Sequence, residues 1–351
     1  MLRRAIPFCV SRNARFGVRH KSSGGRRPKK KTYHRVAELD RVMELRKKPL
    51  MILQLTSLIL SQPHHSPLFL RDLEKNVGFV RKWAFMALID KHPSVFRVAG
   101  APPSVSLTGR ARNLAQEEAH ARASMEPLLV TNLRKLLMLC VDCKLPLQTV
   151  ELVGPQLGLP SDFKDCLVPK YPQFFTVRRF RGRDCLLLED WDSTLAVTAR
   201  ETRLAQEGVL DLKANGDRRK LERWQKLEFP SPYLNARRFD AADPKARKRS
   251  VAVLHELLSL TMEKRMTSAQ LEAFHSECLL PSQLLLCLIK HQGIFYLTNK
   301  GERSTVLLKD AYIGSNLIDK CPLLQFYDKF MALCGRGNID LCDKNSIPTV
   351  I

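Results

Sequence analysis

The chain has 351 residues and a formal net charge of +23 at pH 7, with 58 Lys and Arg against 35 Asp and Glu. This length allows two or three small domains or one composite domain with an ample core. No stretch reaches the roughly 18 apolar residues that a membrane-spanning helix needs, so we expect no membrane partner. The charge excess indicates a polyanionic partner, with a basic, merely solvated surface as the alternative.

The first 31 residues form a basic leader that contains many Lys and Arg and no acid. Apolar residues are interspersed among the arginines, and the continuous apolar core of a secretory signal is missing. This composition predicts a mitochondrial transit peptide, with the chloroplast as the alternative destination. A disordered arm that binds nucleic acid directly is the alternative role. Without the leader, the charge excess is still about +12.

A short phrase closes an apolar helical run three times, at Lys91 to Phe96, Lys170 to Phe175 and Lys290 to Phe295. A strand-like stretch follows each copy, and the closing Phe is expected to fill the core of its own unit. Recurrence of one unit predicts repeated modules. Helices followed by a two-stranded hairpin form a winged-helix arrangement. We therefore predict a helix-rich α+β fold of three tandem winged-helix-like modules, packed as one composite RNA-binding body.

The helices are predicted from apolar periodicity, proline and capping signals. Copy one is expected to have helices at 50–60, 68–77 and 80–89. Copy two is expected to have helices at 133–141 and 149–157, a turn at Leu145-Pro146, and a third helix from 159. Copy three is expected to have a helix at 251–260, a capping box at Thr267 and Gln270 before the second, and a third helix from 280. Hairpins are predicted after Phe96, Phe175 and Phe295.

This arrangement divides the chain into a leader, a body and a tail. The predicted bounds are 1–31 for the transit peptide or basic leader, 32–335 for the RNA-binding body and 336–351 for the C-terminal tail. Within the body, the modules are expected at about 48–110, 130–192 and 248–312, with a charged insertion at about 199–250.

No catalytic or metal-binding pattern is complete. His255-Glu256 begins like the zinc helix of a metalloprotease, but Ser259 stands where the second His is required. Among ten cysteines, only Cys140 and Cys143 have a metal-like spacing, and they lack a second pair. We therefore expect buried reduced thiols, no enzymatic activity, no metal, no cofactor and no small-molecule substrate.

Two basic clusters are the candidates for RNA contacts. The first lies on the hairpin of copy two and contains Arg178, Arg179, Phe180, Arg181 and Arg183. Strand alternation would place Arg179, Arg181 and Arg183 on one face. Guanidinium groups suit phosphates, and an exposed aromatic ring can stack on unpaired bases. The second cluster begins copy three and contains Lys245, Arg247, Lys248 and Arg249. A solvated hairpin tip and a charged helix start are the alternatives.

Several stretches resemble the plant organelle RNA recognition (PORR) domain family. The most specific is Val251 to Thr261 with Glu263-Lys264-Arg265. Further matches are Leu133 to Met138, Leu157 to Phe163, Ser231-Pro232-Tyr233, and Gly293 to Tyr296 with Lys300-Gly301 and Thr305-Val306. The resemblance implies an organelle protein that binds group II intron RNA and promotes its splicing without catalysing it. The family provides no accepted RNA-contacting residues, so the two clusters rest on charge and position.

We therefore expect a mitochondrial protein whose partners are intron-containing organelle RNA and other splicing factors. Two alternatives stay open. The first is a winged-helix DNA-binding factor that places a helix in the major groove. The third helices have few base-reading side chains, which disfavours it. The second is a protein-interaction scaffold of an organelle ribonucleoprotein, in which copies one and three bind proteins.

Overall fold

The computed structural model describes residues 35–62, 68–73, 75, 79–207, 229–239, 243–300 and 303–333, without the side chains of 46–50, 79–84, 204, 206 and 207. The predicted leader, the C-terminal tail and the middle of the charged insertion lie outside the described residues.

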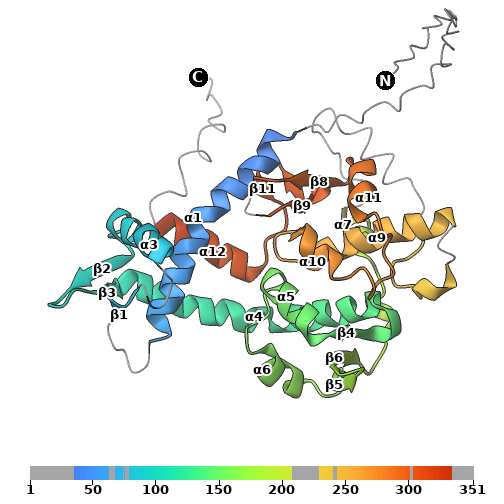
Figure 1. Ribbon diagram of the computed structural model, residues 1–351, viewed down its shortest axis with the longest axis horizontal. Coiled ribbons are helices and arrows are strands. Elements are labelled where there is room, and N and C mark those ends of the chain that lie inside the picture. Colours follow the sequence, from blue (N-terminus) through green and yellow to red (C-terminus); the bar gives the residue numbers. More distant parts are fainter. Residues whose placement is uncertain are drawn as a thin grey trace, which may run out of the picture. The chain divides into compact units, whose positions relative to one another are not determined.

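Helices dominate this body, and short strands lie between them (Figure 1). The helices are α1 (Ala37–Leu60), α3 (Phe79–Lys91), α4 (Gly109–Leu139), α5 (Leu147–Leu157), α6 (Phe163–Lys170), α7 (Ala199–Glu207), α9 (Pro244–Leu260), α10 (Ser268–Glu272), α11 (Leu284–Lys290) and α12 (Pro322–Leu333). The strands are β1 (Leu68–Phe69), β2 (Phe96–Ala99), β3 (Ser104–Leu107), β4 (Lys144–Pro146), β5 (Phe175–Phe180), β6 (Arg183–Leu188), β7 (Arg265–Thr267), β8 (Phe295–Thr298), β9 (Thr305–Leu308), β10 (Tyr312–Ile313) and β11 (Asn316–Leu317). The predicted helix-rich α+β class is confirmed.

Three of the sheets share one connectivity. Their strand orders are β1-β3-β2, β4-β6-β5 and β7-β9-β8, and all pairs are antiparallel. In each sheet, a short strand that follows a long helix pairs with the last strand of a hairpin later in the chain. The hairpins begin at the residues predicted from the repeated phrase. The remaining pair, β10 and β11, follows the third sheet.

The first strand of each sheet was not predicted. Residues 68–69 form β1 where a helix was expected, and Leu145-Pro146 belongs to β4 where a turn was expected. These strands have two or three residues, which is too short to show an alternating pattern. Their hydrogen-bond partners lie far along the chain, as Leu145 pairs with Leu186. Long-range pairing, and no local signal, therefore decides their conformation.

Local capping explains where several helices begin and end. The predicted capping box of Thr267 and Gln270 is present and starts α10. Asp243 caps α9, whose first residue is Pro244. The α5 helix ends at Gly158, whose φ of +85° suits glycine. A Cβ at this position would lie 2.8 Å from Sδ of Met262, so the Met262 side chain would have to shift to accept any other residue here.

The core confirms the expected role of the three closing phenylalanines. Phe96, Phe175 and Phe295 are 3%, 2% and 2% exposed, and each begins the hairpin of its own sheet. The core is continuous through the three sheets and their helices. None of the described helices is both long and apolar enough to cross a membrane.

Two helices tie distant parts of the chain together. The carboxylate of Asp40, in the first turns of α1, accepts hydrogen bonds from Tyr296 Oη (2.9 Å) and Thr298 Oγ1 (2.5 Å) of β8. The α12 helix packs along α4, where Lys329 Nζ lies 3.8 Å from Glu117 Oε2. The start of α1 is therefore held by hydrogen bonds to the β7-β9-β8 sheet.

Candidate nucleic-acid interface

The β5–β6 hairpin presents the first basic cluster at its tip. Phe180 pairs with Arg183, so the connection has only two residues, Arg181 and Gly182. Their φ values of +48° and +79° give both the left-handed conformation that tight hairpin turns require. All four arginines of the cluster are exposed, and Phe180 is 38% exposed. A tight turn thus projects guanidinium groups and one aromatic ring into solvent.

The register divides these side chains differently from the prediction. Phe180 lies opposite Arg183, and Arg179 lies opposite Asp184. Residues directly opposite share a face, so Arg183 is on the face of Phe180 and Arg179 is on the other. The prediction that Arg179, Arg181 and Arg183 share one face is therefore wrong. Alternation stops at the two-residue turn, and Arg181 belongs to that turn.

A lysine from the neighbouring strand completes the face of Phe180. Nζ of Lys144, in β4, lies 5.2 Å from the centroid of the Phe180 ring, within cation–π range. Nη2 of Arg178 lies 2.9 Å from Oε1 of Glu189 on the same face. Away from the tip, where Arg179 is exposed, the opposite face carries the buried Phe175 and Leu186 and belongs to the core.

The second cluster divides between surface and interior. Lys245, Arg247 and Lys248 are exposed in the first two turns of α9, whose first turn has no acid. Cations are unfavourable near a helix N-terminus, so they do not serve the helix itself. Arg249 is only 3% exposed and donates to the carbonyl oxygens of Pro232, Leu234 and Cys278 at 3.1–3.2 Å.

The structure therefore corrects the prediction for Arg249. Burial lowers the pKa of its guanidinium group, and three carbonyl groups take up its donors. This side chain holds the 232–234 segment and the loop at Cys278 against α9, and it has no access to RNA. A run of basic letters gives no sign of which member points inward, because that depends on tertiary packing.

The segment that Arg249 holds continues to Arg237, a further cation that lies near the β5–β6 hairpin. Nη2 of Arg237 lies 2.9 Å from Oδ2 of Asp142, and Nζ of Lys144 lies 3.2 Å from the same oxygen. Partial burial would raise the pKa of Asp142, but the hydrogen bond from Lys144 and the charge of Arg237 lower it. Asp142 thus links the two cations, and the segment 232–238 lies between the clusters that the sequence placed far apart.

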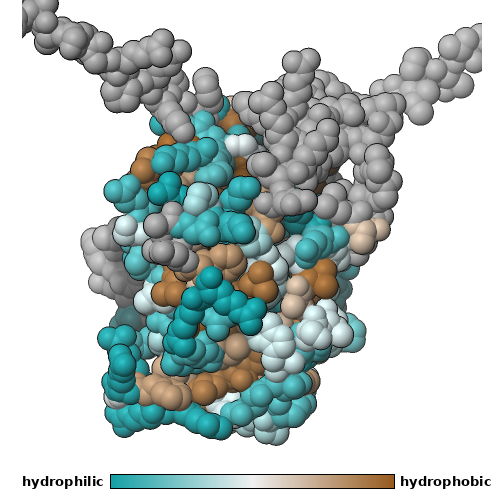
Figure 2. Space-filling view, turned by 90° about the vertical axis from the view of Figure 1, so that its right-hand side faces the viewer, coloured by the Kyte–Doolittle hydropathy of each residue, from teal (hydrophilic) through white to brown (hydrophobic). Residues whose placement is uncertain are grey.

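Figure 2 shows the right-hand side of the view in Figure 1, where α9 and β4 are labelled. Hydrophilic surface covers much of this side, with hydrophobic patches between. We call the hairpin tip with Lys144 and Arg237 the wing surface. Sequence reasoning missed Lys144 and Arg237, because one lysine in a three-residue strand and an arginine pair in a short turn show no pattern that links them.

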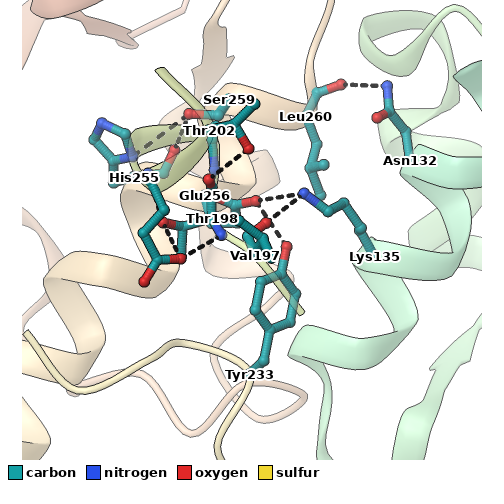
Figure 3. A network of polar contacts seen from close by, with 12 residues as sticks. Asn132, Lys135, Val197, Thr198, Thr202, Tyr233, His255, Glu256, Ser259 and Leu260 are labelled. Carbon is teal, nitrogen blue, oxygen red and sulfur yellow. Dashed lines mark hydrogen bonds and ion pairs between the residues drawn. The ribbon is translucent and has the colours of Figure 1, made fainter. Parts of the chain in front are cut away.

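A buried polar network fixes the segments around this surface (Figure 3). Glu256 of α9 is fully buried and accepts hydrogen bonds from Tyr233 Oη (2.7 Å), the Ala199 amide (2.9 Å) and Lys135 Nζ (3.4 Å). Burial first, and then the charge of Glu256, raise the pKa of Tyr233. The network connects α4, α9 and both ends of the charged insertion. It therefore positions the segment that carries Arg237.

His255, beside this network, forms a second buried group. Its Nε2 lies 3.0 Å from Oδ2 of Asp310, and its Nδ1 lies 3.5 Å from the Ser259 hydroxyl. Burial would raise the pKa of Asp310, yet His255 and the charge of Arg203 lower it. Ser259 donates to the His255 carbonyl oxygen at 2.8 Å, so this hydroxyl is already engaged.

The described residues include no cluster of three or more His, Cys, Asp or Glu that could hold a metal ion. Cys140, the first member of the metal-like pair, has its Sγ 3.9 Å from Sγ of the buried Cys278. The hydrogen bond with Cys278 first, and then burial, raise the pKa of the Cys140 thiol. Both sulfur atoms belong to the core.

The helix-rich body and the arginine-bearing hairpin are typical of a nucleic-acid-binding protein. The chain belongs to the plant organelle RNA recognition domain family, whose profile matches residues 34–339. The family suspected from the sequence is thereby confirmed, and it supports an organellar, RNA-related function.

Curated relatives agree with this membership. The chain is 32% identical to the chloroplastic WHAT'S THIS FACTOR 1 homolog of Arabidopsis thaliana over 93% of the chain and 66% of that protein. It is 31% identical to ROOT PRIMORDIUM DEFECTIVE 1 of Arabidopsis thaliana, over 83% of the chain and 80% of that protein. It is 27% identical to the mitochondrial WHAT'S THIS FACTOR 9 of the same plant, over 72% of the chain and 70% of that protein.

The chain spans slightly less than two thirds of the length of the chloroplastic relatives, with 63% to 66% of each covered. No solved structure matches the chain. The names of the relatives include both a chloroplast and a mitochondrial protein. They support an organelle location and leave the choice of organelle open.

Proposed function

We propose that this protein binds group II intron RNA in mitochondria and promotes splicing without catalysing it. Family membership and the organelle names of the relatives support the organellar, RNA-related part. The early arginines of the leader favour mitochondria over chloroplasts. The observation that carries the proposal is the β5–β6 hairpin, which exposes four arginines and one aromatic ring at a two-residue turn.

In this proposal the body consists of three winged-helix-like modules. The shared strand order of the three sheets, each preceded by a long helix and closed by a hairpin, supports that description. Only the hairpin of the second module carries four arginines. We therefore assign RNA contact chiefly to the second module, together with the exposed lysines and arginine at the start of α9.

The proposed mechanism is passive. Exposed guanidinium and ammonium groups neutralise phosphates of the intron and release bound counterions, so affinity falls steeply with salt. Contacts to unpaired bases supply sequence preference. The RNA, held in the shape that splicing needs, performs the chemistry, and other splicing factors join the same complex.

A DNA-binding function is less well supported by the third helices. In α6, Lys170 is paired with Glu126 at 2.5 Å, which leaves Lys164 as its other lysine. In α11, Leu285 and Leu286 are 52% and 43% exposed, and leucine cannot read base edges by hydrogen bonds. The exposed leucines favour a contact with protein for the third module, within the same ribonucleoprotein.

Replacing Arg178, Arg179, Arg181 and Arg183 together with Ala tests the proposal. We expect at least a tenfold loss of affinity for a group II intron transcript, because up to four phosphate contacts disappear. The melting temperature should stay nearly unchanged, since all four side chains are exposed. Filter binding with intron RNA and with duplex DNA as competitor gives the measurement. Unchanged RNA affinity, or stronger binding of the DNA, would contradict the proposal.

A further inference from the structure

Asp142 holds two cations that come from different parts of the chain. Its Oδ2 atom accepts from Lys144 of β4 at 3.2 Å and from Arg237 of the 236–238 turn at 2.9 Å. The side chains of Arg237 and Lys144 are 62% and 34% exposed, so both remain open to a ligand. Lys144 also lies over Phe180 at the base of the hairpin tip.

We infer that Lys144 and Arg237 bind phosphates of single-stranded RNA at the wing surface, and that Asp142 competes with the RNA for them. This inference rests on the proposed function, because it extends the surface assigned there to RNA. It adds two contact residues, names an unpaired strand as the ligand, and identifies an acidic residue that limits affinity in the free protein.

The strength of exposed ion pairs explains why RNA can replace Asp142. Such pairs contribute little because water screens both charges. One carboxylate oxygen here serves two cations, whereas each phosphate of an RNA strand offers its own charged oxygens. Binding of RNA also releases counterions, a gain that Asp142 cannot supply. The cations are therefore kept ordered by Asp142 and are still available.

Phe180 indicates that the strand is unpaired. Its ring is 38% exposed beside Lys144, and Arg183 shares its face. An aromatic ring surrounded by cations stacks on a base only when that base is free of its complement. In a duplex the bases are stacked on one another, and only phosphates reach the protein.

Arg237 is held in place before RNA arrives. Arg249 fixes the carbonyl groups of Pro232 and Leu234, and Tyr233 is bound to the buried Glu256. A fixed segment loses less entropy on binding than a free loop. The cationic surface thus runs from the hairpin tip through Lys144 and Arg237 toward the start of α9.

The test uses the full chain and two probes, a fluorescein-labelled single-stranded RNA and the same strand annealed to its complement. Fluorescence anisotropy at several salt concentrations gives the affinity and its salt dependence. We expect Lys144→Ala and Arg237→Ala each to reduce the slope of log affinity against log salt by about 0.7, one phosphate contact on a single strand. Phe180→Leu should weaken binding of the single strand and leave binding of the duplex unchanged. Phe180→Tyr, which keeps an aromatic ring, should bind the single strand like the wild type.

Asp142→Asn tests the competition directly. Asn keeps the left-handed backbone of this position, where φ is +58°, and removes the charge. We expect about two- to fivefold tighter binding at low salt, the equivalent of one exposed ion pair. Glu117→Gln is the matched control, since it removes the same charge beside Lys329 of α12. Lys329→Ala and Arg122→Ala, each paired with an acid on α4, control for the two lost cations.

The outcomes separate this inference from the proposed function. If the fourfold arginine variant loses affinity while Lys144→Ala and Arg237→Ala bind like the wild type, the inference is overturned and the proposed function stands. If the fourfold variant also binds normally, the proposed function fails as well. If Glu117→Gln raises the affinity for RNA as much as Asp142→Asn does, the gain comes from net charge alone. The inference that Asp142 competes with RNA is then overturned.

Discussion

At the scale of single residues, neighbours in a basic run have opposite roles. Lys248 is exposed on α9, and the next residue, Arg249, is buried with three carbonyl partners. Lys248 and Arg249 therefore have different roles although both are positively charged. A buried guanidinium group contributes through satisfied hydrogen bonds, and an exposed ammonium group is available to a ligand.

Arg249→Leu should therefore destabilise the fold by about 2–4 kcal/mol, because two buried carbonyl groups, of Pro232 and Cys278, and the partly buried carbonyl group of Leu234 lose their donor. Urea unfolding followed by circular dichroism measures the change. Lys248→Ala is the matched control and should shift the free energy of unfolding by less than about 0.5 kcal/mol. Equal effects of the two substitutions would show that Arg249 is not a structural residue.

At the scale of elements, two glycines with similar backbone conformations have different surroundings. Gly158 ends α5 with φ of +85° and has Met262 Sδ 2.8 Å from the Cβ position. Gly182 lies in the β5–β6 turn with φ of +79° and has no atom within 4 Å of that position. The left-handed backbone favours glycine at both positions, and at Gly158 a side chain would also have to displace Met262.

Gly158→Ala should accordingly lower stability more than Gly182→Ala. The strained left-handed backbone costs each variant about 1–2 kcal/mol, and the contact with Met262 adds to the loss at Gly158. Thermal unfolding of both variants gives the comparison. An equal decrease in melting temperature would mean that the chain around Met262 moves aside without loss.

At the scale of the whole molecule, paired carboxylates make the fold sensitive to acid. His255 and Arg203 hold the pKa of Asp310 below its ordinary value despite burial. Unfolded Asp has a pKa of about 3.9, so the stabilisation is complete above that pH and is lost as pH falls through the lower native value. The hydrogen bonds of Asp192 with Thr194 act in the same direction.

The free energy of unfolding should thus decrease as pH falls below about 4. Asp310→Asn should show a smaller decrease over the same range, since the titrating group is gone. Urea titrations from neutral pH downward give the curve, with the exposed Asp184→Asn as control. The assignment to Asp310 fails if its variant has the same acid dependence as the wild type.

The sequence predicted features with a local cause and missed those with a distant one. The capping box at Thr267, the buried Phe175 and the hairpin after it follow from neighbouring residues. The strand β4 and the burial of Arg249 depend on segments far along the chain. The α4 helix was predicted only from 133 onward because its earlier turns, from Gly109, are polar and have few buried residues.

The candidate site divides along the same line. Runs of arginine at 178–183 could be found by composition, and their distribution over the two hairpin faces could not. Lys144 and Arg237 are far apart in the sequence, but in the structure both contact Asp142, and Lys144 also lies over the Phe180 ring. The tertiary contacts among β4, the 236–238 turn and the β5–β6 hairpin leave no pattern in a single sequence.

The hydrogen bonds from Tyr296 and Thr298 to Asp40 join residues 256 and 258 positions apart. A chain that leaves a ribosome or an import channel from its N-terminal end presents α1 long before β8 exists. The Asp40 carboxylate in the early turns of this helix therefore lacks its native hydrogen-bond donors until synthesis or translocation has passed the third hairpin. We expect α1 to reach its native position only after β8 has formed, because a chain truncated before β8 lacks both donors to Asp40.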